Sequence, residues 1–262
     1  MCGIFGFVLK KPVETEKVLK VLKKLEKHKY ANEPKPVGGY GAGIAIIIDA
    51  GEILLEKVGK ADDSPAENLS KKLKLAEASV LVGHVRLPSP GFMETARFKE
   101  TAQPYVAQCF SNLKIVSAHN GNMLNYKVVR EKLFGRHVFE SERVELIDSE
   151  VIPHLFEELL LNKATVNDAL DRLFSTMEGP NTVSLLQIDK KRLFLHFVHK
   201  GRTRGLTIWK NNDGEVVFCS RKEPLVEELG DMLSNGGFKE QASIAYGEER
   251  ELKATFNFTF FP

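Results

Sequence analysis

The sequence predicts an α+β fold in which two β-sheets lie between outer helices. Short apolar runs typical of strands come in blocks, and segments with the 3.6-residue repeat of helices come in pairs. This order favours separate helix and sheet layers over a doubly wound parallel sheet, in which strands and helices alternate. Because no repeat, low-complexity tract or linker interrupts the sequence, we expect residues 1–262 to form a single domain.

The individual elements are predicted from the spacing of apolar residues. Amphipathic helices are expected at 13–29, 65–77, 125–134, 149–161, 166–177 and 224–229. Strands are expected at 2–8, 44–48, 53–55, 79–85, 113–118, 183–188, 193–198, 206–209 and 216–218. Residues 49–52 predict a turn between two strands, and the proline-rich segments 31–41 and 87–104 predict loops.

The composition limits the partners of the protein. Its 37 basic residues nearly balance the 35 acidic ones, so the net charge of +2 does not favour a nucleic acid or a membrane surface. Lys10 and Lys11 follow the apolar N-terminal run too soon for a signal peptide or a membrane span, which predicts a cytoplasmic protein. Cys2, Cys109 and Cys219 are spaced too widely for a disulfide framework or a zinc site with paired ligands. We expect reduced thiols, with Cys109 and Cys219 buried as structural residues.

Cys2 is the most informative residue of the chain. Methionine is normally removed when the next residue is small, and Cys2 would then carry both a thiol and the α-amino group. Because an α-amino group titrates near ~7.7–8.0, part of it is unprotonated at neutral pH and accepts the thiol proton. One residue would thus supply nucleophile and base. The alternative, which position 2 by itself leaves open, is a buried cysteine of an N-terminal core strand.

Three polar segments stand at the ends of predicted elements: two follow apolar strands and one precedes a helix. Arg86 ends a strand, where a guanidinium binds a carboxylate through two hydrogen bonds; the alternative is a surface salt bridge. Asn120 and Gly121 offer a side-chain amide and a backbone N–H for an oxyanion; the alternative is an ordinary turn. Asp148 precedes a helix, where it would pair with a substrate ammonium group; the alternative is that Asp148 or Ser149 caps the helix.

These groups together fit one class of substrate. An α-amino acid would use both the arginine and the aspartate, and attack by a thiol requires an acyl carbon on the side chain. Glutamine meets both requirements. The predicted reaction is hydrolysis of the side-chain amide through a Cys2 γ-glutamyl thioester, which releases ammonia and then glutamate.

The same motifs resemble a known family. In chain order, Met-Cys-Gly-Ile-Phe-Gly, Gly-His-Val-Arg, His-Asn-Gly-Asn and Asp-Ser-Glu-Val resemble the N-terminal-nucleophile glutaminase domains of the class II glutamine amidotransferases, over nearly the whole chain. The resemblance implies a four-layer αββα sandwich. It also implies a role for each matching residue: Cys2 as nucleophile, Asn120 and Gly121 as oxyanion hole, Arg86 and Ser89 as ligands of the substrate carboxylate, and Asp148 as ligand of its ammonium. The chain departs from the family pattern at His28, Leu87 and Pro90.

The resemblance also implies partners. Members of the family that aminate a substrate carry a second domain for that step, and this sequence holds no phosphate loop or nucleotide motif. We therefore expect a free-standing subunit without cofactor or metal, which hydrolyses L-glutamine and passes ammonia to a separate synthase subunit. Homo-oligomerisation is left open. Two alternatives also stay open: an N-terminal-nucleophile hydrolase of another amide or γ-glutamyl compound, and a non-catalytic glutamine-sensing module.

Overall fold

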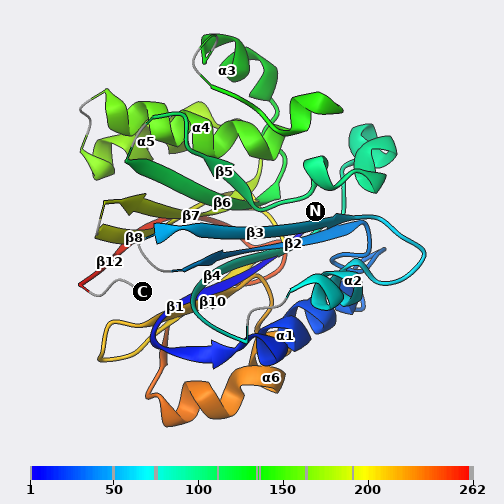
Figure 1. Ribbon diagram of the computed structural model, residues 1–262, viewed down its shortest axis with the longest axis vertical. Coiled ribbons are helices and arrows are strands. Elements are labelled where there is room, and N and C mark those ends of the chain that lie inside the picture. The colour runs from blue at the N-terminus through cyan, green and yellow to red at the C-terminus, as the bar shows by residue number, and fades with distance from the viewer. Residues whose placement is uncertain are drawn as a thin grey trace.

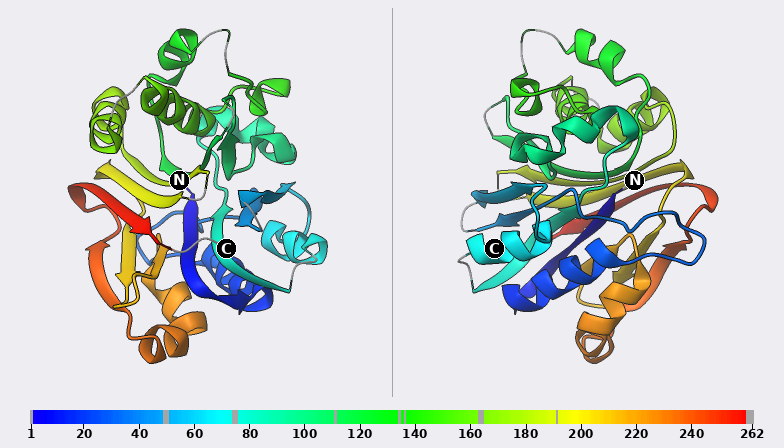
Figure 2. Two further views of the ribbon diagram at one scale, coloured as in Figure 1. Left: turned by 60° about the vertical axis from the view of Figure 1, so that its left-hand side comes forward. Right: turned by 90° about the vertical axis from the view of Figure 1, so that its right-hand side faces the viewer.

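The computed structural model describes residues 2–48, 51–73, 76–110, 112–133, 135, 137–162, 165–190 and 192–259. Two antiparallel sheets lie face to face, and helices cover the outer face of each sheet (Figure 1, Figure 2). The four layers follow the order αββα. The predicted fold class, a four-layer α+β sandwich, is therefore confirmed. Within the described residues, no helix is long and apolar enough to cross a membrane.

The two sheets differ in size. The larger sheet has the strand order β11-β9-β10-β1-β4-β2-β3, and the smaller has the order β12-β8-β7-β6-β5. Strands of the larger sheet are β1 (Gly3–Glu14), β2 (Gly41–Ile47), β3 (Ile53–Gly59), β4 (Glu77–Val85), β9 (Leu206–Lys210), β10 (Val216–Cys219) and β11 (Lys239–Ile244). Strands of the smaller sheet are β5 (Tyr105–Ala107), β6 (Leu113–Gly121), β7 (Asn181–Asp189), β8 (Arg192–Arg202) and β12 (Glu249–Phe258).

Each helical layer packs on one sheet. The layer on the larger sheet consists of α1 (Thr15–Lys27), α2 (Pro65–Lys72) and α6 (Lys222–Asn235). The layer on the smaller sheet consists of α3 (Tyr126–Lys132), α4 (Asp148–Leu161) and α5 (Val166–Thr176). Three apolar clusters fill the spaces: one under each helical layer, and one between the two sheets.

The residue order of β1 shows how one strand contributes to two of these clusters. Its side chains alternate between the faces of the sheet, because successive residues of a strand point in opposite directions. Phe5 and Phe7 pack toward α1 and α6, whereas Ile4 and Val8 pack into the cluster between the sheets. A slip of one residue would exchange these sets, so this run of apolar residues fixes the register of β1.

Most predicted elements are confirmed, but some of their ends are wrong. The helix predicted at 13–29 begins later, because Val13 and Glu14 extend β1 and pair with the start of β4 after a bulge. The helix predicted at 65–77 ends at Lys72. Helical spacing continues in the sequence beyond that residue, but the chain leaves the helix in order to enter β4.

Several features go beyond the prediction. Strands β5, β11 and β12 are not among the predicted elements, and the predicted loop at 87–104 contains two short 3₁₀ segments, η2 (Pro90–Arg97) and η3 (Lys99–Thr101). The predicted turn at 49–52 lies partly outside the described residues, as does the last position of the helix predicted at 125–134.

The strand register brings the ends of distant segments together. Gly3 at the start of β1 pairs with Val85 at the end of β4, so Cys2 lies beside the residues that follow β4. Figure 1 shows the N-terminal end of the chain between the two helical layers. The end of β6 and the start of α4 approach the same place from the smaller sheet and its helices.

Candidate active site

The residues singled out in the sequence surround one pocket. Five of them, Cys2, Arg86, Ser89, Gly121 and Asp148, line it directly. Asn120 lies between two lining residues on β6. The other lining residues are Leu87, Pro88, Phe92, Gln103, His119, Ile147 and Ser149. The structure therefore collects all six predicted site residues in one place, from four segments that are far apart in the sequence.

Cys2 directly precedes β1, is buried, and lines this pocket. The backbone N–H of Leu87 lies 3.3 Å from Cys2 Sγ and donates toward it, while Leu87 O lies 3.4 Å from the same sulfur. The next residue is crowded: a side chain on Gly3 would place Cβ 2.5 Å from Val37 Cγ1. Cys2 is thus buried, as the alternative predicts, and also faces the pocket. The processing of Met1 lies outside the described residues.

Arg86 is a buried cation. Its side chain is 3% exposed, and its guanidinium donates to Thr101 Oγ1 at 2.5 Å and to Thr95 Oγ1 at 2.8 Å. Among the described residues it forms no ion pair, so the alternative of a surface salt bridge is wrong. Burial lowers the pKa of Arg86 from its ordinary value, because the guanidinium has lost hydration. A third hydrogen bond runs from Arg86 Nη1 to the backbone oxygen of Thr95 at 3.5 Å, so all these partners are neutral, and a buried cation with neutral partners favours an anion in the pocket.

Asp148 is the corresponding buried anion. It is the first residue of α4, and its Oδ2 accepts a hydrogen bond from the backbone N–H of Met123 at 2.9 Å. Ile147 occupies the N-cap position and neither Asp148 nor Ser149 caps the helix, so the capping alternative is wrong. The positive end of the helix dipole favours a negative charge here. Within the described part of the chain, Asp148 forms no ion pair.

Asn120 and Gly121 end β6 and pair with β7, so the alternative of an ordinary tight turn is wrong. Asn120 is fully buried, yet neither Oδ1 nor Nδ2 finds a hydrogen-bond partner among the described residues. An unpaired buried amide costs free energy unless a ligand satisfies it. A Cβ on Gly121 would lie 2.3 Å from Pro180 O, so only glycine fits this close approach.

A network that sequence reasoning did not assign supports the pocket. His119 donates its backbone N–H to Gln103 Oε1 at 2.7 Å, and its Nδ1 lies 2.9 Å from Ser149 Oγ. Gln103 Nε2 donates to Ser149 Oγ at 3.1 Å, so each of these three residues contacts the other two. Burial lowers the pKa of His119, which keeps the imidazole neutral near pH 7. The signal in the sequence that indicates Gln103 is the dipeptide Gln103-Pro104, which also resembles a segment of the class II glutamine amidotransferases.

Glu33, in the segment between α1 and β2, forms buried ion pairs with two arginines from the last third of the chain. Glu33 Oε1 accepts a hydrogen bond from Arg221 and lies 3.1 Å from Arg204 Nη1. The guanidinium of Arg221 also stacks on the ring of Tyr30, 4.2 Å from its centroid. His28, where the chain departs from the family pattern, ends α1 in this region and has its Nε2 3.7 Å from a carboxylate oxygen of the α6 residue Glu223.

Comparison with curated proteins finds relatives named glutamine–fructose-6-phosphate aminotransferase (isomerizing). The protein of Sulfolobus acidocaldarius is 32% identical over 200 residues, which cover 74% of this chain and 30% of that protein. That of Pyrococcus horikoshii is 31% identical over 200 residues, covering 74% of this chain and 29% of that protein. The chain therefore matches about 30% of the length of these relatives. No protein family model matches the chain.

Comparison with solved structures supports the fold. The allosteric regulatory enzyme of purine biosynthesis superposes with a TM-score of 0.64 over 99% of this chain and 50% of that one, at 17% identity. A class-II glutamine aminotransferase domain protein of Silicibacter pomeroyi superposes with a TM-score of 0.51 over 97% of this chain and 99% of that one, at 13% identity. Together, the curated relatives, the αββα fold and the motifs around Cys2 show that the chain belongs to the class II glutamine amidotransferases.

Proposed function

We propose that the protein hydrolyses L-glutamine to glutamate and ammonia, with Cys2 as the nucleophile. The observation that carries this proposal is the pair of buried, opposite charges in the Cys2 pocket. Arg86 and Asp148 both line it, and neither forms an ion pair within the described residues. A zwitterionic α-amino acid head group satisfies both, its carboxylate at Arg86 and its ammonium at Asp148.

In the proposed reaction, the Cys2 thiolate attacks the side-chain carbonyl carbon of glutamine. The new C–S bond forms as the carbonyl electrons move to oxygen, and the Asn120 amide with the Gly121 N–H stabilises that oxyanion. The protonated α-amino group returns the thiol proton to the departing nitrogen, the carbon–nitrogen bond breaks, and ammonia leaves while the acyl group stays on Cys2 as a γ-glutamyl thioester. Water attacks the thioester, which releases glutamate and restores the thiol. After removal of Met1, the α-amino group of Cys2 serves as the base.

Substrate entry requires the pocket to open. Its cavity is about 20 Å³, which holds about one water molecule. The outer wall is formed by Pro88, Ser89 and Phe92, at the start of the irregular segment after β4. We infer that this wall moves outward when glutamine binds and closes again over it, as mobile segments do in many enzymes. Ser89 is then placed to hold the substrate carboxylate beside Arg86.

The ammonia is proposed to pass to a separate synthase subunit, in the cytoplasm. The curated relatives support transfer in general, because they are named for aminating fructose 6-phosphate and extend well beyond the part that this chain matches. Glutaminase activity is to be titrated with candidate synthase subunits. Binding and stimulation by one of them are expected, whereas full activity that no synthase changes would contradict the coupling.

A hydrolysis panel tests the glutamine proposal. It contains L-glutamine, the analogue without the α-ammonium group and the analogue without the α-carboxylate. We expect ammonia release only from glutamine, and trapping of the acyl group by hydroxylamine as the γ-glutamyl hydroxamate. Cys2→Ala should abolish both, while Cys219→Ala, in the core under α1 and α6, should retain both. Preference for an analogue, or undiminished turnover by Cys2→Ala, would refute the assignment.

A further inference from the structure

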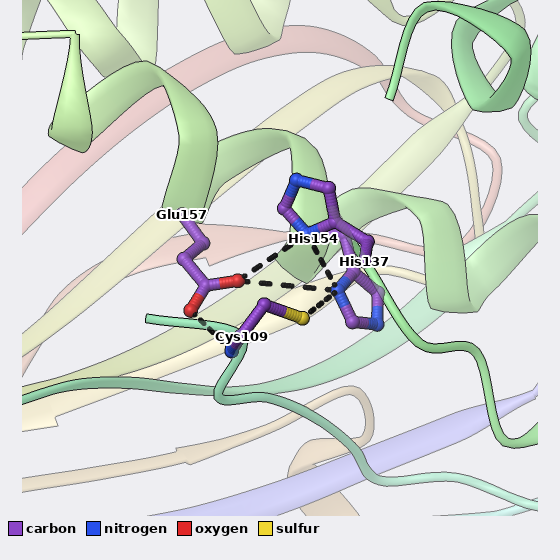
Figure 3. A group of neighbouring side chains, drawn as sticks. All are labelled: Cys109, His137, His154 and Glu157. Carbon is purple, nitrogen blue, oxygen red and sulfur yellow. Dashed lines mark hydrogen bonds and ion pairs between the residues drawn. The ribbon is translucent and has the colours of Figure 1, made fainter. Parts of the chain in front are cut away.

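A second cluster of reactive side chains lies further along α4 from the Cys2 pocket (Figure 3). Cys109 comes from the connection between β5 and β6, and His137 from the connection between α3 and the 3₁₀ segment η4 (Ser141–Arg143). His154 and Glu157 lie one turn apart on α4, so they share one face of the helix. One ligand-type atom of each residue lies within 4.8 Å of those of the other three.

The separations of these atoms are close to the edges of a metal-centred tetrahedron, with one slightly shorter and one longer. Cys109 Sγ lies 3.4 Å from His154 Nδ1, and the Nδ1 atoms of His137 and His154 are 3.1 Å apart. Glu157 Oε2 lies 3.4 Å from His137 Nδ1 and 4.0 Å from His154 Nδ1. Ligands bound at ~2.0–2.3 Å to one tetrahedral Zn²⁺ would lie about 3.3–3.6 Å from one another.

The charges of the cluster also favour a cation. The Glu157 side chain is fully buried; its Oε1 accepts the backbone N–H groups of Cys109 and Phe110 at 2.8 and 3.3 Å. Its Oε2, which faces the two histidines, has no hydrogen-bond partner among the described residues. A buried carboxylate without full compensation is costly. The Glu157 carboxylate and a Cys109 thiolate together carry two negative charges, which one divalent cation neutralises.

The groups that contact these four residues resemble those that contact the ligands of metal sites. The far nitrogen of His137, Nε2, lies 3.1 Å from Glu158 Oε2, an arrangement of carboxylate and histidine that orients an imidazole toward a metal. Aromatic rings cover the site: Phe139 lies 4.2 Å from His154 and Phe110 lies 5.5 Å from His137, between ring centroids. The rings shield the two histidines from water, while Cys109 is half-buried.

We propose that Cys109, His137, His154 and Glu157 form a structural Zn²⁺ site. Thiolate, imidazole and carboxylate are the donors that Zn²⁺ takes in tetrahedral sites, and four protein ligands leave no open position for catalysis. The site is distinct from the Cys2 pocket, but both use α4. Asp148 begins this helix at the pocket, while His154 and Glu157 on the next turns would be tied by the metal to the β5–β6 connection.

Metal content of the full chain tests the proposal. The protein is produced in zinc-supplemented medium and purified without chelators and without metal-affinity chromatography. Its metal content is then measured by inductively coupled plasma mass spectrometry. We expect about one zinc per chain. After removal of zinc, Co²⁺ should give the visible bands of tetrahedral cobalt and a thiolate-to-cobalt charge-transfer band. Cys109→Ser should lose that charge-transfer band.

Matched variants locate the metal. Glu158→Gln leaves all four ligands in place and should weaken zinc binding roughly 10- to 100-fold, whereas Glu131→Gln on the surface of α3 should leave it unchanged. Cys2→Ala and Cys219→Ser should retain the zinc. Failure of the folded wild-type chain to bind Zn²⁺ or Co²⁺ would overturn the proposal. Equal binding by wild type, Cys109→Ser and Glu158→Gln would overturn it too. None of these measurements depends on glutaminase activity.

Discussion

Asp148 accepts the backbone N–H of Met123 at 2.9 Å, which ties the first residue of α4 to the segment that leaves β6. This bond fixes the carboxylate next to the strand end that carries Asn120 and Gly121. A substrate whose ammonium group binds at Asp148 is thereby placed relative to the proposed oxyanion hole. This hydrogen bond therefore connects the part of the pocket proposed to hold the head group with the part proposed to hold the reacting carbonyl.

Replacing Asp148 by asparagine removes the charge and keeps an oxygen for the Met123 N–H. We expect the KM for glutamine to rise about 10- to 100-fold, the amount that a lost charged hydrogen bond represents, with a smaller change in kcat. Steady-state assays of ammonia release measure both constants. Glu145→Gln, an exposed change close to the start of α4, serves as control and should alter KM less than twofold. An unchanged KM in Asp148→Asn would exclude the ammonium-binding role.

Asn120→Ala should act on kcat. Its amide has no hydrogen-bond partner among the described residues, so its removal breaks none of their hydrogen bonds. Loss of one oxyanion donor should reduce kcat by about 10²–10³, while KM changes little. The same substitution at the exposed Asn257 of β12 should leave both constants as they are. If Asn120→Ala retained the wild-type kcat, the oxyanion would have to be stabilised by other groups.

Much of this arrangement was predictable, because short motifs carry it. Cys2, Arg86, Asn120-Gly121 and Asp148 each stand at the end or start of an apolar run, and antiparallel strand ends meet at the same edge of a sandwich. The sequence does not reveal which alternative holds at each position. That Arg86 binds threonine hydroxyls and forms no ion pair within the described residues, for example, depends on the placement of Thr95 and Thr101 by the loop after β4.

Other features depend on contacts that no local pattern encodes. The sequence predicts Cys109 as a buried structural thiol, but the structure leaves it half-buried, and His137 and His154 reach it only through the packing of α4 on the smaller sheet. Glu33 stands in a proline-rich segment that predicts only a loop, and its burial depends on Arg204 and Arg221 from the other end of the chain. Such long-range groups become visible only once the strand order is known.

Glu33→Gln tests the buried ion-pair group. The variant keeps the shape of the side chain but leaves Arg204 and Arg221 buried beside each other without a counter-charge. We expect the free energy of unfolding to fall by about 3–5 kcal/mol, as when one partner of a buried pair is removed. Denaturant titration measures it. Glu249→Gln, which breaks an exposed pair with Arg202, should cost at most about 1 kcal/mol. If both variants lost the same free energy of unfolding, the buried ion pairs of Glu33 would stabilise the protein no more than an exposed pair does.

Stability should also fall in mild acid, because burial lowers the pKa of His84 and of His196 to about 3. An unfolded histidine titrates near ~6.5, so between these values the unfolded chain binds protons that the native chain excludes. Their contribution is therefore complete above about pH 6.5 and decreases as the pH falls toward 3. From pH 7 to pH 5, each histidine should lower the free energy of unfolding by roughly 2 kcal/mol.

His196→Gln isolates one of these contributions, and denaturant titrations at pH 7 and pH 5 measure it. Between the two pH values, the free energy of unfolding of the variant should fall by roughly 2 kcal/mol less than that of the wild type, because glutamine does not titrate. Thr255→Val is the matched control: it removes the hydroxyl 3.0 Å from His196 Nδ1 but leaves the imidazole buried, so its acid sensitivity should equal that of the wild type. If the free energy of unfolding fell equally in all three proteins between pH 7 and pH 5, His196 would take up its proton in the folded state. Burial would then not lower its pKa as expected.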